Sequence, residues 1–197
     1  MASIGNFNIA PTEAVDISVA YPGKAAGRRF PNKGWYTLRT TDAFTSESFV
    51  PNKANTALTF QIDPTIVGPT NEGYQLKFSS GRISAKTYAR TDRSGKSVTV
   101  SQLSDYLKAA GFTGVVPGDE QSQADLVEQQ AGSTFDALLD WRAWDPSTQK
   151  EVKGMENFPS DGNGGYIPYL LSESQTDDEG NPKRIWANLE IVRFSNR

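Results

Sequence analysis

Cysteine and histidine are both absent from the 197 residues of the sequence. Without them a protein cannot form a disulfide, a thiolate nucleophile, a Ser-His or Cys-His catalytic pair, or an ordinary zinc or iron–sulfur site. An enzyme of this composition would depend on carboxylates, on Lys or Tyr as acid or base, or on Mg²⁺ or Ca²⁺ bound by oxygen ligands. We therefore expect a protein that is not an enzyme and uses no cofactor.

Long apolar runs are also missing from the sequence. No stretch approaches the roughly 18 consecutive apolar residues of a membrane span, and residues 1–10 lack the basic and apolar regions of a secretory signal. We expect no membrane partner and a protein made and kept in a cytoplasm. With 37% hydrophobic and 11% aromatic residues, the chain can bury one core without disulfides or metal.

The net charge of −3 conceals two oppositely charged parts of the chain. Residues 21–100 hold twelve bases against five acids, a balance of +7, whereas residues 101–197 hold eight bases against sixteen acids, a balance of −8. An asymmetry of this size suggests a surface that receives an anion. The alternative is that the two parts attract each other within one domain.

Alternation of apolar and polar residues predicts strands on both sides of a helical segment. The stretches with this pattern are residues 35–44, 58–63, 74–79, 82–88, 135–144, 166–171 and 185–194. Residues 64–73 and 92–96 are rich in turn residues. In the last strand the inward positions switch near Val192 and Phe194, which indicates a bulge.

The period changes to that of a helix after residue 100. Ser101 can cap a helix with the apolar stripe Leu103, Tyr106, Leu107 and Ala110, and Gly111 follows where a left-handed residue is favoured. A second helix is predicted over residues 120–131.

This order of elements predicts a mainly β fold. An OB-like five-stranded antiparallel barrel would place its helical insertion between strands three and four, and here a long hairpin excursion would precede the last strand. Residues 1–34 would form an N-terminal arm or loop and residues 35–197 a single OB-like domain. A β-sandwich with a helical insertion is the alternative.

The basic part of the chain also holds most of the aromatic residues that could contact a ligand. Cations follow phosphates and flat rings stack on bases, so this combination is typical of single-stranded nucleic-acid binding. The candidate stacking residues are Trp35, Tyr36 and Tyr88. The candidate phosphate contacts are Arg39, Lys77, Arg82, Lys86, Arg90, Arg93 and Lys96. Because Trp141 and Trp144 fall on alternating faces, at most one of them is expected to point outward.

Carboxylates offer the alternative of metal-dependent nuclease chemistry. Asp136 and Asp140 lie four residues apart on one strand face, and residues 177–179 are a run of acids. Acids in such positions are more often a solvated strand face and a hairpin turn, and we adopt that interpretation.

Several segments resemble phage-encoded single-stranded DNA-binding proteins with an OB fold. The similar segments are WYTLRT, LTFQI, YQLKF, the basic turn ARTDRSGK, the helix SQLSDYLKAAGF, AGSTFDALLDWRAW and the final ANLEIVRF, within residues 35–194. The resemblance implies an OB fold and sequence-tolerant DNA binding in phage replication or recombination, in the host cytoplasm. The chain ends in residues 193–197, RFSNR, and so departs from the acidic tail common in such proteins.

The expected partner is single-stranded DNA. Further candidates are replication or recombination proteins that meet the acidic C-terminal half, and a second copy of the chain in a homo-oligomer. The alternative function is that of a structural virion or assembly protein, which would self-associate symmetrically through an apolar patch.

Overall fold

The computed structural model describes residues 30–41 and 58–195. As expected, the protein is mainly β, and all its strand pairs are antiparallel. The central strand is β7, Thr134–Asp145, which pairs with β1 (Gly34–Arg39), β11 (Asn188–Phe194) and β8 (Lys150–Lys153). Strand β1 also pairs with β3, Thr65–Gly68.

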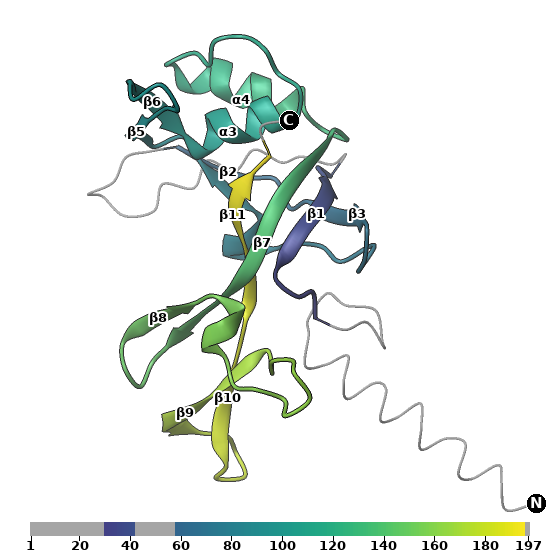
Figure 1. Ribbon diagram of the computed structural model, residues 1–197, viewed down its shortest axis with the longest axis vertical. Helices are drawn as coiled ribbons and strands as arrows, with labels where there is room; N and C mark the ends of the chain where they lie inside the picture. The colour runs from purple at the N-terminus through teal and green to yellow at the C-terminus, as the bar shows by residue number, and fades with distance from the viewer. Residues whose placement is uncertain (1–29, 42–57, 196–197) are drawn as a thin grey trace, which may run out of the picture.

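The remaining strands form three two-stranded ladders, β2–β4, β5–β6 and β9–β10. Their bounds are β2 Thr59–Gln61, β4 Arg82–Ser84, β5 Thr87–Thr91, β6 Ser97–Ser101, β9 Tyr169–Thr176 and β10 Pro182–Trp186. Two 3₁₀ turns are η1, Phe78–Gly81, and η2, Met155–Asn157. The β5–β6 hairpin lies beside the helices at one end of the molecule, and the β9–β10 hairpin forms the opposite end (Figure 1).

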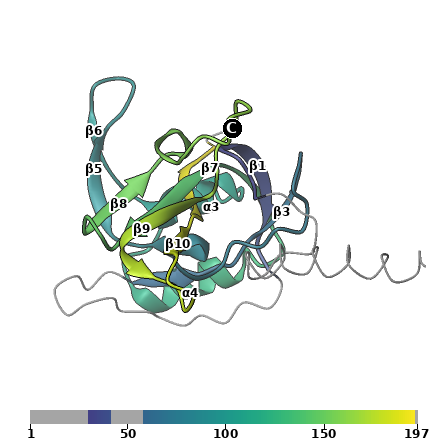
Figure 2. The same cartoon turned by 90° about the horizontal axis from the view of Figure 1, so that it is seen from below.

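Strict alternation along β7 builds the core. Its odd-numbered residues from Phe135 to Ala143 are all buried. The Phe135 ring meets Tyr106 edge-on at 5.2 Å between centroids and Phe194 at 5.7 Å. Seen from below, the strands curve around this core and around helix α3, Gln102–Ala109 (Figure 2).

Both predicted helices are confirmed. Ser101 caps α3 through a reciprocal pair of bonds with Ser104: the Ser104 N–H donates to Ser101 Oγ at 3.0 Å, and the Ser101 N–H donates to Ser104 Oγ at 2.8 Å. Gly111 follows with a φ of +98°, which favours glycine. Helix α4, Glu120–Glu128, begins at an Asp119 cap.

The region from residue 64 to 79 differs from the expected order of turn and strand. Strand β3 occupies part of the expected turn, and the turn itself contains Asn71 at φ +58° and Gly73 at φ +77°. The expected strand at residues 74–79 is reduced to an isolated bridge between Gln75 and Thr65, followed by η1. The β-branched residues of β3 favour a strand and pair with β1, so the ladder forms at residues 65–68 and not at residues 74–79.

The predicted bulge in the last strand is confirmed. The pairing of β11 with β7 shifts between Ile191 and Arg193, and Phe194 returns to the core. Val192 was expected to point inward, but it is 56% exposed because it is the extra residue of the bulge.

The end of the expected N-terminal arm packs into the domain. The Phe30 ring meets the Trp141 ring at 5.5 Å, and the Trp141 indole N–H donates to the Pro31 carbonyl at 2.7 Å. The rest of the expected arm, residues 1–29, lies outside the described residues. Within residues 30–41 and 58–195, neither helix has the length and apolar character that a membrane crossing needs.

Replacing Ser101 tests how much the cap contributes. We expect Ser101→Ala to lower the free energy of unfolding by about 1 kcal/mol, because the backbone N–H of Ser104 loses its acceptor, Ser101 Oγ. Urea denaturation measures the change. The control Ser97→Ala, at an exposed position of the same strand, should stay within about 0.5 kcal/mol of the parent. Equal effects of both substitutions would contradict the cap.

Candidate nucleic-acid interface

One face of the β5–β6 hairpin gathers bases and an aromatic ring. Tyr88 pairs with Val100 and Arg90 with Val98, and paired residues share a face with their neighbours two positions away. Lys86 lies two residues before Tyr88 in the sequence, and all five residues of β5 are exposed. We name Lys86, Tyr88, Arg90, Arg93 and Lys96 the hairpin patch.

The tip of this hairpin is a tightly bonded turn. Asp92 Oδ1 accepts from the Ser94 hydroxyl at 2.7 Å, the Ser94 N–H at 2.8 Å and the Lys96 N–H at 3.0 Å. These bonds, above all that from the Ser94 hydroxyl, lower the pKa of Asp92. The turn therefore holds the backbone of the exposed Arg93 and Lys96 in a defined loop.

An ion pair fixes the hairpin relative to helix α3. Both terminal nitrogens of Arg90 donate to the Asp105 carboxylate, at 3.1 and 3.2 Å. A bidentate pair restricts the angle between two elements as well as their distance. Arg90 is thus the residue of the hairpin patch that also positions the arm.

A second group lies on the outer face of the main sheet. Trp35 and Arg193 both pair with Leu138, from β1 and β11 on either side of β7. The Arg193 guanidinium lies 5.3 Å from the centroid of the Trp35 ring, which is 44% exposed. Arg39 lies four residues after Trp35 on the same face of β1 and is exposed. We name Trp35, Arg39, Leu138 and Arg193 the sheet patch.

The alternation of β1 corrects one predicted stacking residue. Tyr36 is buried at 6% exposure, and its hydroxyl donates to the Asn32 carbonyl at 2.8 Å. Its ring belongs to the core and presents no face to a ligand. The expectation for the other pair of rings is confirmed, since Trp141 is buried and Trp144 is 55% exposed.

Two predicted phosphate contacts lie outside the β5–β6 hairpin. Lys77 is exposed but precedes η1, on a different part of the chain from the hairpin. Arg82 lies in β4, half-buried, and its Nε donates to Gln61 Oε1 at 2.8 Å. Conversely, Arg193 was not predicted, because the candidates were taken from the basic part of the chain, residues 21–100, and Arg193 lies in the acidic part.

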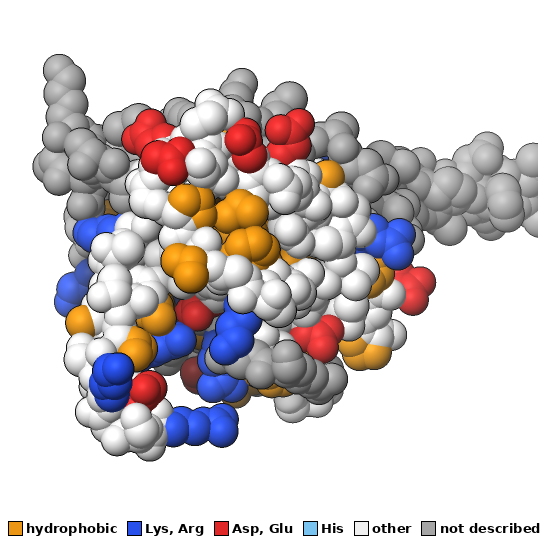
Figure 3. All heavy atoms as spheres, turned by 90° about the horizontal axis from the view of Figure 1, so that it is seen from above, with side chains coloured by type: hydrophobic (Ala, Val, Ile, Leu, Met, Phe, Trp, Pro, Cys, Tyr) orange, Lys and Arg blue, Asp and Glu red, His pale blue; other side chains and the backbone are white. Residues whose placement is uncertain are grey.

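Acidic side chains form a group at one edge of the helical end of the molecule. Seen from above, they lie along that edge beside a hydrophobic group, and the basic side chains lie away from it, interspersed with other acids (Figure 3). The exposed acids of α4 and its cap are Asp119, Glu120, Asp125 and Glu128. The charge asymmetry along the sequence thus has a counterpart in space.

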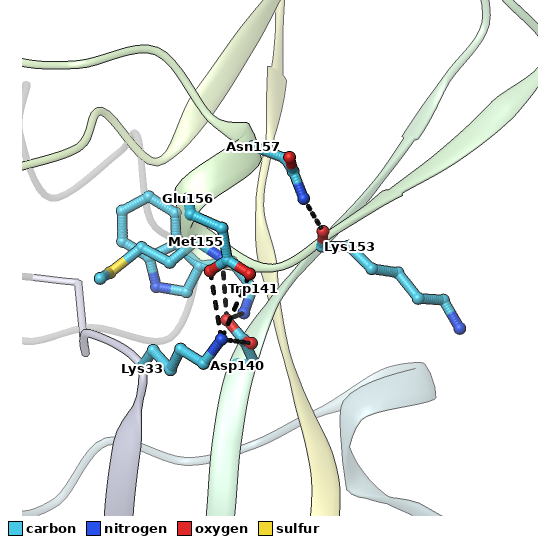
Figure 4. A network of polar contacts seen from close by, with 7 residues as sticks. All are labelled: Lys33, Asp140, Trp141, Lys153, Met155, Glu156 and Asn157. Carbon is cyan, nitrogen blue, oxygen red and sulfur yellow. Dashed lines mark hydrogen bonds and ion pairs between the residues drawn. The ribbon is translucent and has the colours of Figure 1, made fainter.

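Asp140 does not have the solvated position expected of it. Its side chain is buried, and Oδ1 accepts from the N–H groups of Trp141 and Met155 at 2.8 and 2.9 Å (Figure 4). Lys33 Nζ lies 2.9 Å from Asp140 Oδ2 and 3.1 Å from Glu156 Oε2. The bond to Asp140, followed by that to Glu156, raises the pKa of Lys33. Asp140 therefore ties β7 to η2 and to the N-terminal segment.

The other acid of this strand also has a local partner. Asp136 Oδ1 accepts from the Thr37 hydroxyl of β1 at 2.7 Å. Within residues 30–41 and 58–195, no group of three or more acids is placed to hold a metal ion. The contacts of Asp136 and Asp140 are those of residues that join elements of the fold.

Comparison with models of protein families, with curated proteins and with solved structures found no match to this chain.

The adjacent residues Trp35 and Tyr36 should contribute unequally to the stability of the fold. We expect Tyr36→Ala to lower the free energy of unfolding by about 3 kcal/mol, because it opens a cavity in the core. Trp35→Ala should cost about 1 kcal/mol, because it removes an exposed ring and one cation–π contact. Chemical denaturation of the two variants measures both. A larger loss for Trp35→Ala would mean that the faces of β1 are assigned the wrong way round.

Asp140 and Glu156 form a second matched pair. Asp140→Ala leaves two backbone N–H groups without their acceptor, and we expect it to lower the free energy of unfolding by about 3 kcal/mol. Glu156→Gln removes an exposed partner of Lys33 and should leave the unfolding midpoint nearly unchanged. Differential scanning calorimetry compares them, and similar transitions for both variants would contradict the structural role of Asp140.

Proposed function

We propose that the protein binds single-stranded DNA without sequence preference and is not an enzyme. The observation that carries this proposal is the hairpin patch, in which Tyr88, 48% exposed, and Arg90 share one face of a projecting arm and the exposed Lys86 precedes its first strand. Arg93 and Lys96 extend the positive charge to its tip. Bases that follow phosphates beside a ring that stacks are what a sequence-tolerant single-strand site requires.

The sheet patch supports the same proposal independently. Arg193 and Trp35 already form a cation–π pair, so a base that stacks on the ring would also meet a positive charge. Arg39, further along β1, adds a second cation on that face. We propose that the strand contacts both patches.

Strand pairing supports an OB-like barrel as the finer description of the fold. In such a barrel, strand one pairs with two and four, strand two with three, strand four with five, and strand five returns to strand three. If β2 and β3 are taken as one bent strand, the pairs β1–β3, β1–β7, β2–β4 and β7–β11 supply the first four. The helices lie between β6 and β7, after the third strand of this scheme.

The biological role that we propose is strand protection in phage replication or recombination. It rests on the resemblance of residues 35–194 to phage single-stranded DNA-binding proteins and on the two patches. Binding would hold the strand extended by contacts to phosphates and base faces, without hydrogen bonds that select a base.

Titration of tryptophan fluorescence with oligo-dT at several salt concentrations tests the proposal. We expect binding that weakens as salt rises. Tyr88→Ala should weaken it about tenfold, because a base–aromatic stack is worth about 1–3 kcal/mol. Tyr88→Phe keeps the ring and should bind like the parent.

Lys96, next to the turn of the β5–β6 hairpin, and Lys150, at the start of β8, allow the effect of charge to be tested with a matched control. Lys96→Gln removes a base of the hairpin patch and should reduce the slope of log K against log salt by about 0.7. Lys150→Gln removes an equally exposed base at the start of β8 and should leave the slope unchanged. Equal slopes for both variants, or no binding of oligo-dT by the parent at low salt, would refute the proposed site.

A further inference from the structure

The β9–β10 hairpin presents an apolar and aromatic face that the proposed function does not use. Tyr169 pairs with Trp186 and Leu171 with Arg184, so these four residues share one face. Leu170 and Ile185, on the reverse face, pack against the core. The Tyr169 face is therefore turned away from the domain, and Leu171 on it is 57% exposed.

Contacts within this face hold its side chains in place. The rings of Tyr169 and Trp186 meet at 4.8 Å between centroids, and the Arg184 guanidinium lies 5.1 Å from the Tyr169 centroid. Tyrosine, tryptophan and arginine are the residue types most enriched at the energetic centres of protein interfaces. On this projecting hairpin Leu171 and Arg184 are exposed and the rings of Tyr169 and Trp186 are half-buried, a combination that offers a partner an apolar surface with fixed side chains.

The same hairpin is acidic and hollowed near its turn. It carries four acids, Glu173, Asp177, Asp178 and Glu179, against two bases, a balance of −2. A hollow of about 570 Å³ is lined by Leu171, Asp177, Glu179, Asn181, Pro182 and Arg184. Carboxylates beside an apolar wall suit a long basic side chain, whose stem packs on the wall while its charge meets the acids.

The hairpin patch at the other end of the molecule has the complementary chemistry. The arm from Lys86 to Ser101 holds four bases against one acid, a balance of +3. Beside them, Tyr88, Val98 and Val100 give its face an apolar component that is partly exposed. The two hairpins lie at opposite ends of one chain, too far apart to meet within it (Figure 1).

We infer that the β5–β6 hairpin of one copy docks on the outward face and acidic turn of the β9–β10 hairpin of a second copy. Two different surfaces at opposite ends of a chain give a head-to-tail contact, which repeats as an open array unless its rotation closes a ring. The array requires no DNA, although it occupies the same hairpin patch that the proposed function assigns to DNA. Because it depends on charge complementarity, it should weaken as salt rises.

Charge reversal at each hairpin tests the contact by sedimentation velocity over a range of concentrations, without DNA. The first variant, Arg93→Glu with Lys96→Glu, makes the β5–β6 tip acidic. The second, Asp178→Lys with Glu179→Lys, makes the β9–β10 turn basic. We expect the parent to form larger species as concentration rises at low salt, and each variant alone to remain monomeric.

An equimolar mixture of the two variants gives the decisive measurement. Each reversed hairpin then meets a complementary one, so we expect the mixture to associate as the parent does. A matched control, Asp125→Lys with Glu128→Lys, makes the same change of charge on α4 and should associate like the parent. If the double variants do not fold, the single substitutions Lys96→Glu and Glu179→Lys replace them, with smaller shifts in the same directions.

Several outcomes would overturn the inference. A parent that stays monomeric at every concentration, variants that associate like the parent, or a mixture that stays monomeric would each exclude this contact. Loss of association in the α4 control would move the acceptor to that helix. Titration with oligo-dT at a concentration where the parent is monomeric separates the two proposals: the β9–β10 variant should then bind like the parent, and a changed affinity with unchanged association would make this hairpin a nucleic-acid contact instead.

Discussion

Backbone pairing to β7 is the constraint on which the other parts of the structure depend. Three strands bond to its twelve residues, and its alternation directs one set of side chains into the core and the other toward the outer face. Leu138 on that outer face brings Trp35 and Arg193 together, although these residues are far apart in the sequence. Asp140, two residues further along, joins the same strand to the N-terminal segment and to η2. Both the core and the sheet patch therefore depend on the strand pairs that β7 makes.

Features with local causes could be predicted from the sequence. The cap at Ser101, the glycine after α3 and the alternation of residues 135–144 each depend on neighbours within a few positions, and all three are present. The choice between residues 65–68 and 74–79 as strand depends instead on which segment meets β1. Both have strand-forming residues, and the decision lies in tertiary pairing that no local pattern contains.

The candidate surfaces were predictable to a similar degree. The sequence places Lys86, Tyr88 and Arg90 at alternate positions, and the hairpin keeps Tyr88 and Arg90 on one face. It also indicates that Trp35 and Tyr36 point in opposite directions, but which of them is inward depends on the pairing of Leu38 with Phe135. The bond from Arg90 to Asp105 requires the angle between a hairpin and a helix, which follows only from the assembled fold.

The extra residue at Val192 has a consequence for how this strand could vary in length. Before the bulge the inward residues of β11 are odd-numbered, Leu189 and Ile191, and after it the inward residue is Phe194. Loss of residue 192 would restore simple alternation and leave Arg193 opposite Leu138 on the outer face and Phe194 opposite Ala137 in the core. The chain can therefore change or lose residue 192 without turning Arg193 away from Trp35 or Phe194 out of the core.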